Sequence, residues 1–253
     1  MNWINILWII LACVGAFLLG SIPWSVWLGS LFTGKDLREY NIGNPGGFNA
    51  MITFGPLLGY TITFADIGKG TLTIALIDQI FSLSYFMDDS MYWHFAAVIL
   101  GPVCCILGHN YTPWLKFQGG RGMGVIMGTL LYINPLIYWT YMLATATLTQ
   151  GLKLPSRLSS ILTGLLAIPA AFFMPIAPPW TFVHGSIVLA SGIVFLTQGL
   201  LTLCMWIAIL QRNWSGVVHA FSGKEWSFSA LDGQKISNDF ETKKEAIEAK
   251  EKS

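Results

Sequence analysis

A connection between two apolar stretches, GHNYTPWLKFQGGRGMG at 108–124, holds the residue types best suited to chemistry. Four glycines surround Arg121 there: Gly119, Gly120, Gly122 and Gly124. A guanidinium, N–H groups that no side chain covers and the start of a helix each favour a bound anion. The pattern therefore predicts a cradle for phosphate oxygens. Anchoring by positive charge explains Lys116, but it gives no reason for four close glycines.

A second glycine-rich connection, GKDLREYNIGNPGGFNA at 34–50, combines cations with turn-forming residues. Successive N–H groups in such turns form concave sites for anions. The alternative is a loop that is rich in turn formers for structural reasons alone. As a phosphate site, the connection offers these candidate ligands: Arg38, Gly43, Asn44, Gly46 and Asn49.

Ionisable residues also interrupt the apolar context at ADIGKG, residues 65–70. Asp66 and Lys69 are three residues apart, so on a helix they share one face and can pair. Ionisable groups this close to hydrocarbon are costly, and they are normally paired or functional. Pairing with each other and binding a ligand both remain open here. The helix that carries them fits either 50–72 or 67–86.

Further polar residues lie next to these motifs. His109 and Asn110 open the second connection, where His109 either donates to a phosphate, acts as a base or is structural. GSIP at 20–23 interrupts the first apolar run, and Ser21 can bond a carbonyl that Pro23 leaves free; a simple kink is the alternative. The segment 211–226 adds four candidate anion ligands: Arg212, Asn213, His219 and Lys224.

The elements that position these residues follow from composition. The 253 residues are 54% hydrophobic and 11% charged, whereas soluble domains carry about 25% charged residues. Uncharged runs at 3–32 and 182–210 exceed the roughly 20 helical residues that cross a bilayer. The sequence therefore predicts an all-α, polytopic membrane helical bundle. Because no basic residue precedes the first run, we expect a first span and not a cleaved signal peptide.

The distribution of Lys and Arg predicts orientation. Four connections hold them and are expected in the cytoplasm: 33–49, 109–122, 151–158 and the part after 211. The connections at 87–91 and 175–181 have none, so we expect them outside. This places the N-terminus outside and the C-terminus and the active site on the cytoplasmic side of the cell membrane.

The apolar segment 123–150 is then an exception, because both of its flanks lie inside. Two full crossings need about 40 residues, and Asn134–Pro135 interrupts the segment near its middle. We therefore expect a re-entrant hairpin of two half-length helices. The predicted total is five full spans plus two short half-helices, seven helices in all. Residues 1–231 form the membrane domain, and 232–253 form a charged cytoplasmic tail.

Several chemistries lack their usual motifs. No phosphate-binding P-loop, His-Glu-x-x-His, Gly-x-Ser-x-Gly or dinucleotide fingerprint occurs. The four cysteines fall in apolar segments without a Cys-x-x-Cys pair, so no zinc site or disulfide framework is predicted. We expect no metal and no cofactor. With a net charge of +1, no nucleic-acid partner is predicted either.

Taken together, the motifs resemble those of the membrane-integral, acyl-phosphate-dependent glycerol-3-phosphate acyltransferases of bacteria. The matching segments are GSIP at 20–23, DLREYNIGNPGGFN at 36–49, DIGKG at 66–70 and LGHNYTPWLKFQGGRG at 107–122. The resemblance as a whole runs from about residue 15 to about residue 226. The resemblance implies transfer of a fatty acyl group from acyl phosphate to glycerol 3-phosphate, giving lysophosphatidic acid and phosphate for phospholipid biosynthesis. It also implies that substrate phosphate takes the hydroxyl proton. Arg121 and His109 are the candidate catalytic residues.

Departures from the family pattern leave an alternative open. Ile42, Phe48 and Ile52 stand where the family has Ser, Thr and Arg, and Arg121 replaces a Lys. Gln211 stands where the family has a His. Losing one hydrogen bond to a charged ligand costs about 1.5–3 kcal/mol. The alternative is therefore a non-catalytic or substrate-altered homologue that binds or transports an anionic phosphate or lipid.

Overall fold

All regular elements in the described part of the chain are helical. A computed structural model describes residues 3–40, 43–82, 91–174, 178, 180 and 193–221. The helices are α1 Trp3–Ser21, α2 Trp24–Thr33, α3 Gly47–Phe54, α4 Pro56–Phe81, α6 Met91–Asn110, α7 Met123–Ile133, α8 Pro135–Ala146, α9 Ser156–Phe173 and α11 Ile193–Phe221. Short 3₁₀ turns at Leu37–Glu39 and Pro113–Leu115 and a π-turn at Thr147–Gly151 join them. The predicted all-α class is confirmed, while the tail 232–253 lies outside the described residues.

The first apolar run breaks completely at GSIP instead of bending. α1 ends at Ser21 and α2 begins at Trp24, because Pro23 supplies no backbone N–H. Distant residues take up the carbonyls next to the break. Thr112 Oγ1 donates to the Ser21 carbonyl at 2.5 Å, and Lys69 Nζ donates to the Ile22 carbonyl at 3.2 Å. The break thus joins α1, α4 and the second connection at one point.

The predicted break at Asn134–Pro135 is confirmed. Asn134 ends α7 and caps α8, since its Oδ1 accepts from the Ile137 N–H at 3.1 Å. Its Nδ2 donates to Gln198 Oε1 and to the Met174 carbonyl, both at 2.9 Å. With 11 and 12 residues, α7 and α8 are each too short to cross a bilayer. The total of five full spans stays a prediction.

The helix that carries ADIGKG occupies neither of the two placements that the sequence allowed. α4 runs from Pro56 to Phe81, after Gly55 adopts a positive φ of 89° that favours glycine. Proline suits the first helical position, because a backbone N–H at that position would have no partner within the helix. Asp66 and Lys69 therefore lie in the interior of a 26-residue helix.

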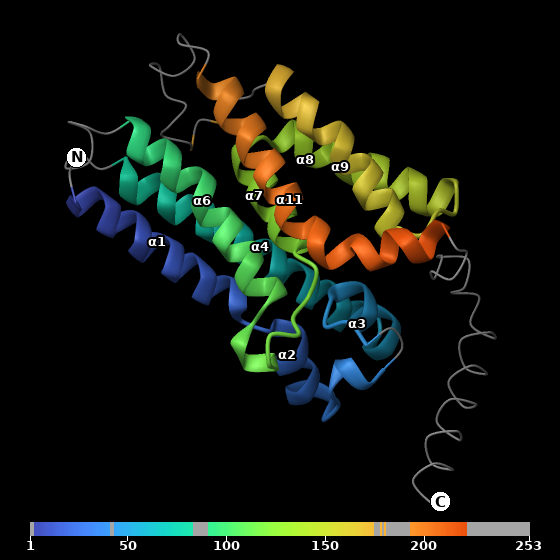
Figure 1. Cartoon of the computed structure of the whole chain (residues 1–253). Helices are drawn as coiled ribbons and strands as arrows, with labels where there is room; N and C mark the ends of the chain where they lie inside the picture. Colours follow the sequence, from blue (N-terminus) through green and yellow to red (C-terminus); the bar gives the residue numbers. More distant parts are fainter. Residues whose placement is uncertain are drawn as a thin grey trace, which may run out of the picture.

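The helices pack closely where glycines face a neighbouring backbone. α1 lies against α6, α4 against α6 and α7, and α9 against α11 (Figure 1). A Cβ on Gly128 of α7 would lie 1.9 Å from the Ile67 carbonyl oxygen of α4, and one on Gly20 of α1 would lie 2.0 Å from that of Cys105. Close approach through small residues is the usual packing of helices in membranes. The close contact at Gly128 holds α7 against α4, and it thereby also fixes the position of Arg121 just before α7.

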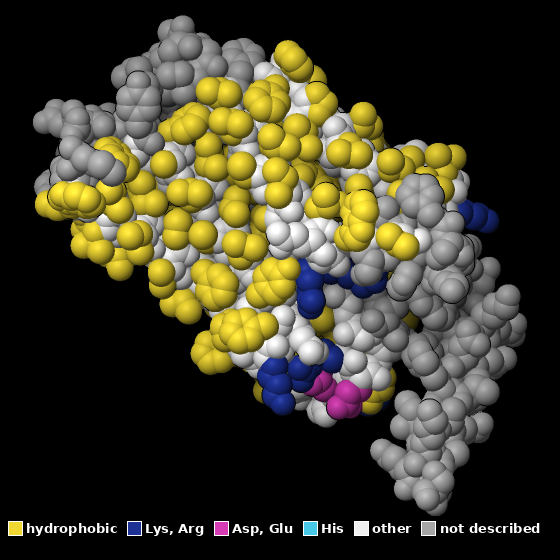
Figure 2. Space-filling view, viewed as in Figure 1, with side chains coloured by type: hydrophobic (Ala, Val, Ile, Leu, Met, Phe, Trp, Pro, Cys, Tyr) yellow, Lys and Arg dark blue, Asp and Glu magenta, His cyan; other side chains and the backbone are white. Residues whose placement is uncertain are grey.

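Much of the described surface carries exposed apolar side chains, as a lipid environment requires. Figure 2 shows hydrophobic side chains over the face formed by α1, α6 and α11, and Lys and Arg toward the end that holds α2 and α3. Trp3, Leu7 and Leu11 of α1 are at least half exposed. By length and composition, the stretches Trp3–Thr33 and Trp93–Leu115 are long and apolar enough to cross a bilayer. The charged end carries the site residues.

Candidate active site

Two cavities meet at the charged end of the bundle. The first, the polar cavity, has a volume of about 610 Å³ and lies between the two glycine-rich connections and α11. The second, the apolar cavity, measures about 350 Å³ and extends between α3, α4, α7, α8 and α9. Three residues line both: Asn44, Arg121 and Arg157. A ligand with an anionic head and an apolar tail fits such a junction.

Four arginines from different parts of the chain line the polar cavity. The Arg38 guanidinium contacts Asp36 through Nε, at 3.0 and 3.1 Å from the two carboxylate oxygens, and through an NH2 group at 2.5 Å. These hydrogen bonds hold the pKa of Asp36 below its usual value and raise the pKa of Arg38. Arg212 donates to the Gly119 carbonyl at 3.1 Å and lies over the Tyr111 ring. Arg121 and Arg157 complete the set.

The glycines around Arg121 serve close packing more than the sequence suggested. The N–H of Gly119 donates to the Asn110 carbonyl at 3.1 Å, and that of Gly120 donates to the His109 carbonyl at 3.0 Å. A Cβ on Gly120 would lie 2.1 Å from His109 Nε2. Two of the N–H groups expected to be open to an anion are therefore bonded within the protein. Gly122, with φ of 79°, turns the chain into α7.

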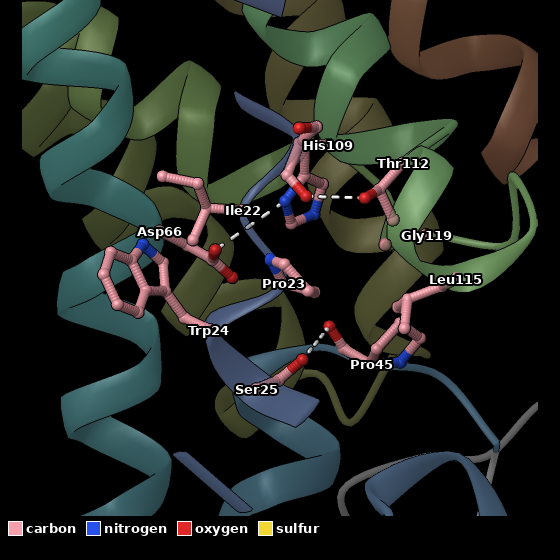
Figure 3. A pocket seen from close by; sticks show the side chains of 12 residues that line it. Ile22, Pro23, Trp24, Ser25, Pro45, Asp66, His109, Thr112, Leu115 and Gly119 are labelled. Carbon is pink, nitrogen blue, oxygen red and sulfur yellow. Dashed lines mark hydrogen bonds and ion pairs between the residues drawn. The ribbon is translucent and has the colours of Figure 1, made fainter. Parts of the chain in front are cut away.

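A buried ionic cluster lies behind the glycine loop. Lys69 Nζ is 2.9 Å from Asp66 Oδ1, so the two residues pair with each other. His109 Nδ1 lies 3.7 Å from the same carboxylate oxygen. Figure 3 shows Asp66 and His109 facing each other near Pro23. All three residues line a small space of about 10 Å³. Such a volume holds at most one water, so this small space forms a wall of the site and does not receive a substrate.

The first glycine-rich connection contributes one side chain to the junction and one to its own support. Asn44 lines both cavities, Gly43 lines the polar cavity, and Gly46 lines the apolar cavity. Asn49 is fully buried, and its Nδ2 donates to the carbonyls of Leu37, Tyr40 and Asn44 at 3.0–3.1 Å. The Asn49 amide thus holds the loop that presents Asn44.

The remaining predicted residues surround the site at different distances. Ser21 Oγ donates to the Leu18 carbonyl and accepts from Trp114 Nε1, in the wall of the small space. Asn110 Nδ2 donates to the Ala208 carbonyl. Asn213 lines the apolar cavity, and its Nδ2 donates to the carbonyls of Ile209 and Arg121. His219 belongs to α11, but its side chain lies outside the described residues, as do Ile42 and Lys224.

Sequence reasoning missed Arg157 as a site residue. Its connection, GLKLPSRL at 151–158, carries no glycine cluster, so its charges indicated only a cytoplasmic location. α9 begins at Ser156 and presents Arg157 to both cavities. No group of three or more His, Cys, Asp or Glu residues suited to a metal ion occurs within the described ranges.

Comparisons with known proteins agree with this architecture. The profile described as Glycerol-3-phosphate acyltransferase matches residues 10–223. A glycerol-3-phosphate acyltransferase of Bacillus cereus (strain G9842) is 36% identical over 156 residues, covering 62% of this chain and 72% of its own. One from Trichodesmium erythraeum (strain IMS101) is 31% identical over 185 residues, covering 69% of this chain and 77% of its own.

The fold is similar to that of a solved membrane enzyme. PlsY (YgiH), an integral membrane glycerol 3-phosphate acyltransferase solved in its glycerol 3-phosphate form, superposes with a TM-score of 0.66 and 21% identity. The match covers 88% of this chain and 97% of that protein. A lysophosphatidic acid form of the same protein matches equally well. Given a profile match over most of its length, the chain belongs to the glycerol-3-phosphate acyltransferase family.

Proposed function

We propose that this chain transfers a fatty acyl group from an acyl phosphate to the 1-hydroxyl of glycerol 3-phosphate, giving lysophosphatidic acid and inorganic phosphate. The observation that carries the proposal is the junction of the two cavities at Arg121 and Asn44. A polar cavity with four arginines suits two phosphate groups, because guanidinium groups bind phosphate oxygens in pairs of hydrogen bonds. The adjoining apolar cavity suits the acyl chain.

The chemistry needs no protein nucleophile. Acyl phosphate is an activated mixed anhydride, so the acceptor oxygen attacks the carbonyl carbon directly. A C–O bond to the acceptor forms, the bond between the carbonyl carbon and the phosphate oxygen breaks, and phosphate leaves. Holding both phosphates in one cavity contributes through proximity, worth up to about 7–11 kcal/mol. In this proposal Arg121 neutralises the charge that develops on the departing phosphate.

The hydroxyl proton has two possible acceptors, His109 and a substrate phosphate. The contacts of His109 favour the phosphate. Its Nδ1 faces Asp66 at 3.7 Å, and its Nε2 lies against Gly120, where a Cβ would come within 2.1 Å. His109 also lines the apolar cavity, but these contacts commit its ring nitrogens to Asp66 and Gly120. We therefore assign His109 to positioning the glycine loop and Asp66, and removal of the proton to the substrate phosphate.

The apolar cavity has the shape and lining that a flexible chain requires. Its walls include Met123 and Met127 from α7, Met142 from α8 and Ile161 from α9. Methionine side chains adapt to irregular apolar ligands because they are unbranched and polarisable. We therefore place the acyl chain between these helices, within the membrane, and the phosphates toward the cytoplasm.

The test is an assay of the purified chain with a long-chain acyl phosphate and glycerol 3-phosphate. We expect lysophosphatidic acid and inorganic phosphate in equal amounts, and no product without the acceptor. Product from acyl-coenzyme A but not from acyl phosphate would overturn the assignment of the donor. If neither donor acylates glycerol 3-phosphate or a panel of related polyol phosphates, the chain is not an acyltransferase.

A substrate-altered homologue is the second candidate. Phe48, at a position where the family pattern has Thr, lines the apolar cavity next to Gly46 and Gly47. A phenyl ring there replaces a hydroxyl that could bond a polar acceptor. An acceptor other than glycerol 3-phosphate, such as glycerol 1-phosphate, then becomes the preferred substrate. The kcat/KM for each acceptor and the stereochemistry of the product decide between the two candidates.

A further inference from the structure

We propose that Arg157 binds the phosphate of the acyl donor together with Arg121, so that the two guanidinium groups hold this phosphate at the junction of the cavities. The inference rests on the proposed function for the identity of the donor. It adds a phosphate-binding side chain from α9, an element that none of the sequence motifs includes.

Position is the first argument. Arg121 and Arg157 are the two arginines, among the four that line the polar cavity, that also line the apolar cavity. An amphiphile whose chain enters the apolar cavity must place its head where the two cavities meet. The arginines at that point come from different elements, the start of α7 and the start of α9. They therefore approach a shared head group from separate walls.

Charge is the second argument. A phosphate near neutral pH carries a charge of about −1.5 to −2. Two guanidinium groups match this charge, and each can donate two parallel hydrogen bonds to phosphate oxygens.

The local structure of α9 gives the third argument. Arg157 follows the first residue of the helix, where a cation meets the positive end of the helix dipole and gains nothing from it. A phosphate bound there is attracted both by the guanidinium and by the positive end of the helix dipole. The helix also packs on α8 and α11, so it presents the guanidinium from a rigid element. The Nε atom is itself buried.

The experiment compares Arg157→Ala and Arg157→Lys with Lys153→Ala in the full-length chain. Lys153 is a matched control, since it is a cation on the same connection, is exposed and lines neither cavity. Binding of hexadecylphosphonate, a stable amphiphile with the donor's head-group chemistry, is measured by calorimetry alongside binding of glycerol 3-phosphate. The KM values for acyl phosphate and glycerol 3-phosphate are measured in parallel.

We expect Arg157→Ala to weaken hexadecylphosphonate binding and raise the acyl-phosphate KM by about 10- to 100-fold, as for the loss of one charge-assisted hydrogen-bonding group. Arg157→Lys should recover part of the loss, and Lys153→Ala should stay within about twofold of the unmodified chain. An unchanged affinity for hexadecylphosphonate in a folded Arg157→Ala protein overturns the proposal. A selective loss of glycerol 3-phosphate binding overturns it as well, because Arg157 would then hold the acceptor.

These readouts separate the proposal from the proposed function. If the unmodified chain forms no lysophosphatidic acid, the acyltransferase assignment fails. The phosphonate titration still tests whether Arg157 binds the phosphate head of an amphiphile. If catalysis is present and the titration does not respond to Arg157, only the role of Arg157 fails.

Discussion

At the scale of single residues, the candidate site combines side chains that line the cavities with side chains that hold the loops in place. Arg121 and Asn44 line both cavities, whereas Asn49 and Lys69 are buried in protein contacts. Asp66 pairs with Lys69 and also lines the apolar cavity. Buried polar groups are costly unless they are paired, so the second set contributes through geometry. Substitutions in the two sets should differ in their effects on activity and on folding.

Arg121→Ala should lower kcat by about 10²- to 10³-fold, the usual cost of removing one group that stabilises developing negative charge. The apparent melting temperature in detergent should change little, because the charge borders a cavity. Cys13→Ala, in the apolar helix α1, is the control and should retain activity. Equal losses in both variants, or no loss in either, would contradict the role of Arg121.

His109→Gln separates the two possible proton acceptors. The second pKa of a phosphate monoester is about 6. A substrate phosphate that acts as the base therefore makes kcat/KM rise with pH through this range, because the deprotonated form is the active one. We expect His109→Gln to lower the rate and to keep the rise near pH 6. A pH profile that becomes flat would identify His109 as the base.

At the scale of helices, glycines decide how close α4 and α7 approach. Gly128 faces the Ile67 carbonyl and Gly70 faces the Val125 carbonyl, each with a virtual Cβ within 2.2 Å of the oxygen. Backbone atoms at such distances cannot move aside cheaply. Because α7 begins two residues after Arg121, this contact also places the guanidinium.

Gly128→Ala should lower the free energy of unfolding by about 1–3 kcal/mol, as overpacking generally does. Gly68→Ala, on the exposed face of α4 with open space around it, is the matched control. It should leave stability unchanged or raise it by up to about 1 kcal/mol, because alanine favours helix over glycine. Apparent melting temperatures in one detergent measure both. Equal destabilisation by the two substitutions would contradict the packing argument.

At the scale of the whole molecule, the apolar belt and the charged end predict an orientation. The belt covers α1, α6 and α11, and the cations gather where α2 and α3 lie (Figure 2). The aromatic residues Trp27 and Trp114 stay about half exposed near this end. Tryptophan is enriched where membrane meets water. We therefore expect the polar cavity to open to the cytoplasm.

Single-cysteine labelling tests this orientation. In a background where the four native cysteines are replaced, Lys35→Cys should not react with an impermeant thiol reagent in intact cells. It should react once the membrane is permeabilised and the reagent reaches the cytoplasmic side. Asp88→Cys, in a connection that lacks Lys and Arg, should react in intact cells. The opposite pattern would invert the topology and place the site outside.

The sequence by itself determined the helical class, the membrane environment and the break at Asn134–Pro135, and it singled out the two glycine-rich connections that line the cavities. These follow from composition, from hydrophobic run length and from the local conformational limits of proline and glycine. It also placed Arg121 and Asn44 among the candidate ligands. All of these features depend on residues that are close in the chain.

Only the tertiary structure decided which groups meet. It directed the N–H groups of Gly119 and Gly120 to protein carbonyls, assigned Asn49 to loop support and brought Arg157 to the junction with Arg121. Local sequence patterns do not carry this information, because α7 and α9, which are distant in the sequence, line the same cavity only in the folded chain. The physical reason is that a buried polar group takes whichever partner the fold brings within reach.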